Sequence, residues 1–99
     1  MKPARFRSVA KAELREAVAW YRERDKTVAR RFLAEVRTSV EFAESFPGAG
    51  APVPGVDDAA IRRLPVHGFP YHVVFIELET RIAILAVAHD RRRPGHWRA

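Results

Sequence analysis

The spacing of apolar residues changes halfway along the chain, and this change restricts the fold more than any other feature. In the first half, apolar side chains recur every three or four residues, as on one face of an α-helix. The first such run extends from residue 8, where Ser8 is a favourable N-cap, to about residue 24. The second run contains Val28, Phe32, Val36, Val40 and Ala43. It stops at Pro47-Gly48, and the break at residues 25–27 is so short that we expect an antiparallel helical hairpin.

The second half of the chain alternates with a period of two, which is typical of β-strands. Residues 61–66, 71–78 and 82–88 are rich in Val, Ile, Phe and Tyr, and we predict a strand in each. His67-Gly68 supplies a tight turn between the first two strands, and Pro65 moves the first strand toward an edge or a bulge. Residues 47–58 contain three prolines, three glycines and two aspartates, so we predict a loop there.

These elements predict an α+β fold in the order β-α-α-β-β-β, with residues 4–7 as the short first strand. The helical hairpin covers one face of a small, mainly antiparallel sheet. A chain of 99 residues has room for one hydrophobic core, and 47% hydrophobic with 30% charged residues is an ordinary globular composition. We therefore expect one domain over residues 1–99.

The composition also excludes several classes of function. The sequence contains no cysteine, which rules out disulfides, thiolate metal sites and cysteine nucleophiles. It contains no signal-peptide core and no run near the roughly 18 apolar residues of a membrane span, so we expect a cytoplasmic protein that does not bind a membrane. No motif in the sequence indicates a cofactor or a metal, so we expect neither. The net charge of +6 makes a polyanion or an acidic protein a suitable partner.

Four stretches, in this order, resemble the RelE/ParE superfamily of bacterial type II toxin-antitoxin toxins. They are AELREAVAWYRER, ARRFLAEV, IRRLPVHGFPYHVVF and ILAVAHDRRRPGHW, and the likeness extends over residues 6–97. The resemblance implies a small basic toxin that a cognate antitoxin neutralises. RelE-like members cleave mRNA on the ribosome, whereas ParE-like members share the fold and inhibit DNA gyrase without a nuclease site, so the fold alone does not give the target.

A metal-independent ribonuclease needs a base, a fixed cation and an acid. The candidates for such catalytic roles are His89, Tyr71 and Arg63. RelE-like nucleases usually include lysines in the sheet and the loop before it, whereas the last lysine here is Lys26. Arginine cannot accept a proton at neutral pH. We therefore favour a ParE-like gyrase inhibitor, with a RelE-like ribonuclease as the alternative and a non-toxic, antitoxin-binding member as the second alternative.

The strand ends and the carboxyl terminus supply the candidate residues for contact with the target. Arg62 and Arg63 are adjacent on a strand and point to opposite faces, so only one of them joins a given site. His89 ends the last strand, on the same face as Leu85 and Val87. The full set of target-binding candidates is Arg62, Arg91, Arg92, Arg93, His96 and Trp97.

Several of these residues have structural interpretations that compete with functional ones. Trp97 either stacks on a base or, as we favour, anchors the carboxyl-terminal segment on the sheet. His72 lies among apolar residues, which is typical of a hydrogen-bonded structural histidine. Trp20, Arg30 and Arg37 on the helices are candidates for antitoxin binding, and a merely solvated helix face is the alternative.

Overall fold

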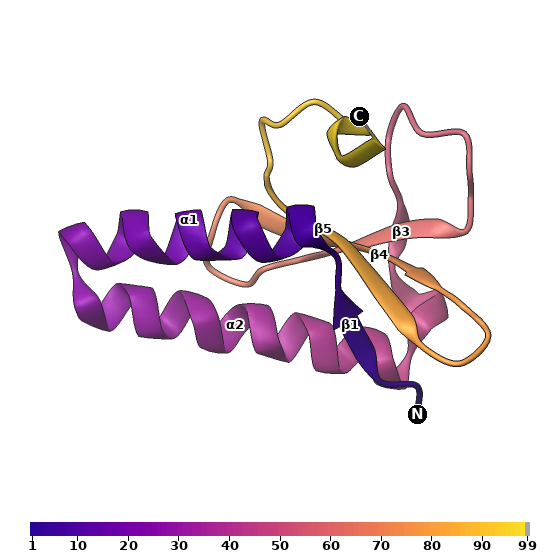
Figure 1. The fold of residues 1–99 in the computed structure, drawn as a ribbon, viewed down its shortest axis with the longest axis horizontal. Coiled ribbons are helices and arrows are strands. Elements are labelled where there is room, and N and C mark those ends of the chain that lie inside the picture. Colours follow the sequence, from indigo (N-terminus) through magenta and orange to yellow (C-terminus); the bar gives the residue numbers. More distant parts are fainter. Residues whose placement is uncertain (99) are drawn as a thin grey trace.

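The structure is a computed structural model that describes residues 1–98. It contains two long helices, α1 (Ser8–Arg24) and α2 (Lys26–Ser45), joined by a single residue, Asp25. Figure 1 shows the two helices side by side and antiparallel, on one side of the sheet. None of the helices in residues 1–98 is both long and apolar enough to span a membrane.

The capping of the two helices differs. Oδ1 of Asp25 accepts hydrogen bonds from the backbone N–H groups of Thr27 (2.8 Å) and Val28 (3.3 Å), so Asp25 is the N-cap of α2. The N-cap of α1 is Arg7, which makes no side-chain capping bond, and Ser8 is already the first helical residue. The prediction that Ser8 caps α1 was therefore wrong by one position.

The sheet has five strands in the order β1-β5-β4-β3-β2. Their bounds are β1 (Ala4–Phe6), β2 (Ala51–Pro52), β3 (Ile61–Pro65), β4 (Tyr71–Glu77) and β5 (Ile82–His89). The β-α-α-β-β-β order is confirmed, with one addition. The predicted loop at residues 47–58 contains a short 3-10 helix (Pro47–Ala49) and the two-residue strand β2, which pairs with β3.

All the strand pairs are antiparallel except β1 with β5, which is parallel. From Pro65 we expected the strand at residues 61–66 to lie toward an edge or to contain a bulge. The corresponding strand, β3, lies next to the edge strand β2, which pairs only with Arg62 and Arg63. The β3–β4 turn contains His67-Gly68 as predicted. Its Phe69 N–H donates to the Val66 carbonyl (3.1 Å), and Gly68 has φ = +82°, which suits a glycine.

The sheet separates two clusters of buried side chains. The larger lies between the sheet and the helices and includes Phe32, Val36, Phe75 and Ile84. The smaller lies on the opposite face, called here the outer face, and includes Val74, Leu85 and Ala88. Residues 93–98 cover part of this outer face, beside the loop that precedes β3 (Figure 1).

One bulge shifts the register of β5 against β4. Val74 pairs with Ala86 but Phe75 pairs with Ile84, so Leu85 has no partner on β4. Leu85 therefore packs in the outer cluster, whereas Val87 packs on the helical side. The sequence predicted that His89 shares a face with both Leu85 and Val87. This is correct for Val87 and wrong for Leu85, because the extra residue in the bulge places Leu85 on the opposite face.

Candidate functional site

The carboxyl-terminal segment, residues 90–98, folds back onto the sheet. Trp97 packs against the outer cluster, and Pro94 lies beside Gly55 in the loop before β3. Nε2 of His96 lies 2.6 Å from Oε2 of Glu13 on α1. Trp97 thus occupies the position of an anchor, the interpretation favoured from the sequence, and His96 is occupied by an intramolecular contact.

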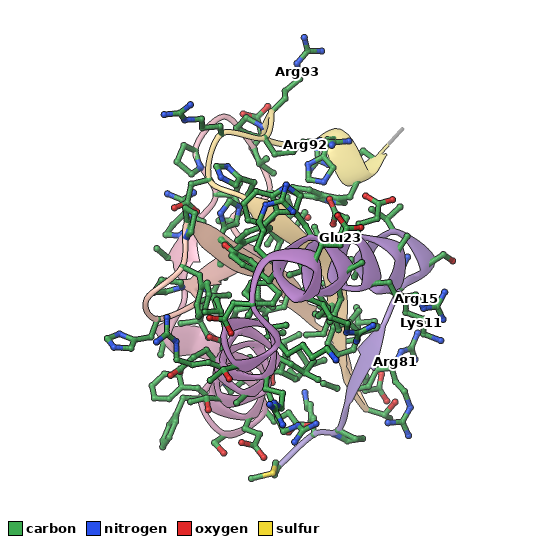
Figure 2. All side chains as sticks on the ribbon, turned by 90° about the vertical axis from the view of Figure 1, so that its left-hand side faces the viewer. Lys11, Arg15, Glu23, Arg81, Arg92 and Arg93 are labelled. Atoms are coloured by element: carbon green, nitrogen blue, oxygen red, sulfur yellow. The ribbon has the colours of Figure 1, made fainter. Side chains whose placement is uncertain are left out.

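The arginine run Arg91-Arg92-Arg93 has a hydrogen-bonded backbone and exposed side chains. The Arg92 N–H donates to the His89 carbonyl (2.8 Å), and the Arg91 N–H donates to Nδ1 of His89 (3.1 Å). All three side chains are exposed, and Figure 2 shows Arg93 directed away from the molecule. This segment therefore presents guanidinium groups from a folded backbone rather than from a frayed tail.

A pocket of about 470 Å³ lies between α1 and the ends of β4 and β5, and we call it the α1–sheet pocket. Its lining includes Trp20, Tyr21, Tyr71, His89 and Arg92. The ring centroids of Tyr71 and His89 are 5.2 Å apart, because the two residues are directly paired across β4 and β5. Trp20 is 50% exposed, although the guanidinium carbon of Arg24 lies 3.6 Å from the centroid of its ring.

The two tyrosines of the pocket stay protonated well above neutral pH. Burial raises the pKa of Tyr21, and burial also raises the pKa of Tyr71, with smaller contributions from the Tyr21 phenolate, once it forms, and from the negative charge of Glu13. A phenol in this state donates a hydrogen bond and does not act as a base at neutral pH. Tyr71 is therefore suited to holding a ligand rather than to removing a proton from it.

The three residues predicted as catalytic do not come together. Tyr71 and His89 lie on the helical side of the sheet. Arg63 pairs with Val74, whose side chain is in the outer cluster, so Arg63 faces the opposite side. As predicted, the two adjacent arginines of β3 lie on opposite faces of the sheet. Arg62 pairs with Phe75 and is on the helical side, whereas Arg63 is on the outer face.

Arg63 instead shares a pocket on the outer face with His72 and Asp90. Nδ1 of His72 lies 3.0 Å from Oδ1 of Asp90, and His72 is only 8% exposed. The buried, hydrogen-bonded environment of His72 agrees with the structural role predicted for it. Asp90 did not emerge as a candidate from the sequence, since its pairing depends on the turn after β5 and leaves no local signal.

The remaining candidates are spread over other surfaces. Nη1 of Arg62 donates to the Gly50 carbonyl (2.7 Å), so Arg62 holds the start of β2 in place. Arg30 and Arg37 are exposed on α2, where Arg30 lines a groove with Val18 and Leu33. Trp20 lies in the α1–sheet pocket and not in this groove, so the three residues predicted for antitoxin binding occupy two surfaces.

Glu13 is a residue of the α1–sheet pocket that sequence reasoning missed. It contacts His96 and accepts the Val87 N–H through Oε1 (3.0 Å). The sequence did contain one indication of this role, because Glu13 is an acidic residue next to the apolar residues of α1. Within residues 1–98 there is no cluster of three or more histidine and acidic side chains that could bind a metal ion.

Comparison with known proteins agrees with this architecture. The family model described as "ParE toxin of type II toxin-antitoxin system, parDE" matches residues 4–94. A solved structure titled "Chromosomal ParDE TA system from P. aeruginosa" aligns with a TM-score of 0.74 at 19% sequence identity. That alignment covers 90% of this chain and 96% of the other. No curated protein sequence matches this chain.

A helical hairpin on one face of a five-stranded mixed sheet is the fold expected for the RelE/ParE superfamily. Because the family model spans almost the whole sequence, the chain belongs to the ParE toxin family of type II toxin-antitoxin systems.

Proposed function

We propose that this chain inhibits DNA gyrase in the cytoplasm and that a cognate antitoxin neutralises it. Membership in the ParE family supports the toxin role and an antitoxin partner. The observation that carries the choice of gyrase over mRNA is the separation of Arg63 from Tyr71 and His89 by the sheet. A ribonuclease built from these three residues has no common site in which to bind one phosphate.

The proposed contact with gyrase uses the α1–sheet pocket and the arginine run beside it. Arg92 lines the pocket together with the half-exposed Trp20 and the acidic Glu13 and Glu16, and the side chains of Arg91 and Arg93 are exposed on either side of Arg92 in the sequence. Aromatic and arginine side chains of this kind commonly dominate the binding energy of protein interfaces. The antitoxin would occupy α2, where Arg30 and Arg37 flank the exposed Leu33.

A supercoiling assay with purified gyrase and relaxed plasmid tests the target. The chain should block supercoiling and trap cleaved DNA, and the variant R91Q/R92Q should need at least tenfold more protein for the same effect. The matched variant R30Q/R37Q removes the same charge from α2 and should inhibit gyrase normally while binding the antitoxin more weakly. Normal supercoiling at a concentration that stops growth would exclude gyrase as the target.

A ribosome-dependent ribonuclease is the second candidate, because one cluster favours it. Arg63 lines the same pocket as a His72 ring that Asp90 orients, and an oriented histidine near a cation is an arrangement that phosphodiester cleavage can use. Induction of the chain should then stop protein synthesis before DNA synthesis. The variant H72Q should abolish mRNA cleavage, whereas H67Q, at an exposed turn position, should not.

A further inference from the structure

Cationic side chains from three separate elements meet at one crevice on the β1 edge of the sheet. The crevice has a volume of about 400 Å³ and is also lined by Phe6, Ser8 and Ala83. Its cations come from β1 and the residue after it, from successive turns of α1, and from the residue before β5. They are Arg5, Arg7, Lys11, Arg15 and Arg81, and we call the site the basic crevice. Figure 2 shows Lys11, Arg15 and Arg81 pointing to the same side of the molecule, away from Arg92 and Arg93.

The charge of the basic crevice is not balanced by the protein. No acidic residue lines it, all five cations are exposed, and none of them forms an ion pair within residues 1–98. Lys2, only three residues before Arg5, does have such a partner, with Nζ 2.9 Å from Oε2 of Glu77. Gathering like charges costs electrostatic energy in the folded state, and a bound anion would offset that cost.

Protection of the sheet edge does not explain the whole cluster. Charged residues on an edge strand prevent it from pairing with other chains, and this purpose accounts for Arg5 on β1. It does not account for Lys11 and Arg15 on a helix or for Arg81, which precedes an internal strand. The first turn of α1, which contains no acidic residue, also opens on the crevice at Ser8 and adds its partial positive charge to that of the side chains.

We propose that the basic crevice binds phosphate groups of the backbone of double-stranded DNA. Guanidinium groups bind phosphate oxygens through paired hydrogen bonds, and four of the five cations are arginines. Sites for single strands add aromatic rings on which bases stack. Here the aromatic residue in the lining is Phe6, which packs against the core, so the crevice is suited to the backbone and not to bases.

An acidic protein segment is a less suitable occupant. Protein interfaces have an apolar centre, whereas the apolar lining here is limited to Phe6, which is partly buried, and Ala83, which is 2% exposed. Interfaces with DNA are more polar and more positive. This inference goes beyond the choice between gyrase and ribosome, because a DNA contact at the β1 edge involves none of the residues assigned to the target.

The test measures binding of labelled duplex DNA to the whole chain by fluorescence anisotropy over a series of salt concentrations. The variant K11Q/R15Q/R81Q should bind at least tenfold more weakly at low salt. Its slope of log affinity against log salt should fall by about 2 to 3, since each phosphate contact contributes about 0.9. The control R22Q/K26Q/R31Q removes the same charge near the α1–α2 junction and should change the affinity less than twofold. Circular dichroism verifies that both variants are folded.

Four results would overturn the proposal. Equal losses in the two triple variants would mean that only net charge matters. A larger loss in R91Q/R92Q/R93Q would assign DNA binding to the carboxyl-terminal arginines. Tighter binding of single-stranded DNA would exclude a duplex site. Displacement of DNA by polyglutamate at a lower charge concentration than by unlabelled duplex would assign the crevice to an acidic protein.

Discussion

Nε2 of His96 lies 2.6 Å from Oε2 of Glu13, and the other oxygen of the same carboxylate accepts the backbone N–H of Val87. One side chain of α1 is therefore bonded both to β5 and to the carboxyl-terminal segment. The side chains of His96 and Glu13 are only 8% and 16% exposed. This contact, together with Trp97, determines where the arginine run emerges from the fold.

Replacing Glu13 with alanine should lower the free energy of unfolding by about 1–3 kcal/mol, since the Val87 N–H and the His96 ring lose their acceptor. Urea denaturation measures this change. The control is E16A, one turn away on the exposed surface, which should change stability by less than about 0.5 kcal/mol. Equal effects of the two substitutions would show that the Glu13 contact contributes nothing.

Gly50 should not tolerate a side chain. A Cβ atom there would lie 2.9 Å from Cζ of the buried Phe75 and 3.0 Å from the carbonyl oxygen of Arg63. We expect G50A to be destabilised by about 1–3 kcal/mol, because neither the packed ring nor the β3 backbone can move freely. In contrast, a Cβ at Gly48 meets no atom within 4 Å, so G48A should have nearly the stability of the unchanged protein in the same thermal melt.

The two helix N-termini should respond differently to loss of a polar side chain. D25A removes the acceptor of two N–H groups of α2 and should cost about 1 kcal/mol. S8A removes a hydroxyl that makes no capping bond and should cost little. Chemical denaturation of both variants compares them directly, and a larger effect at Ser8 would contradict the assignment of Arg7 as the N-cap.

Stability should fall as the pH rises above about 10, the ordinary pKa of tyrosine. The pKa values of Tyr21 and Tyr71 are raised in the folded protein, so the unfolded chain releases these protons first. Alkaline pH therefore favours unfolding, and the loss begins at the unfolded pKa and continues up to the folded pKa.

Ultraviolet absorbance of the phenolate measures this titration without labels, because the sequence contains only these two tyrosines. The midpoint should lie above 10 in the folded protein and return to about 10 in concentrated guanidinium. The variant Y21F leaves Tyr71 as the single titrating phenol. A midpoint of this variant at or below 10 would contradict the burial of Tyr71.

The periodic segments of this chain could be predicted, and the irregular ones could not. The helices and strands β3, β4 and β5 each bury one face over several residues, which leaves a period in the sequence. β2 has two residues, Ala51 and Pro52, too few for any period to appear. The bulge at Leu85 was also invisible, because Ile82–His89 is apolar at almost every position and both registers look equally hydrophobic.

The candidate site shows the same division between local and distant information. Alternation along β3 correctly predicted that Arg62 and Arg63 separate, and the Trp97 anchor followed from its apolar surface. The basic crevice was not predicted, because Arg5 and Arg81 become neighbours only through the parallel pairing of β1 with β5. Pairing between the two ends of a chain leaves no pattern in either end.

The parallel pairing of β1 with β5 also affects when the protein can fold during its synthesis. Ala4 and Phe6 emerge from the ribosome long before their partners Ile82 and Ile84, which are made almost eighty residues later. Until then β1 has no neighbour, and α1 lacks the strand against which it packs. The α1–sheet pocket therefore assembles only after β5 has been made, because Val87 and His89 of β5 line it, and a chain that stops before β5 lacks the strand that joins β1 to β4.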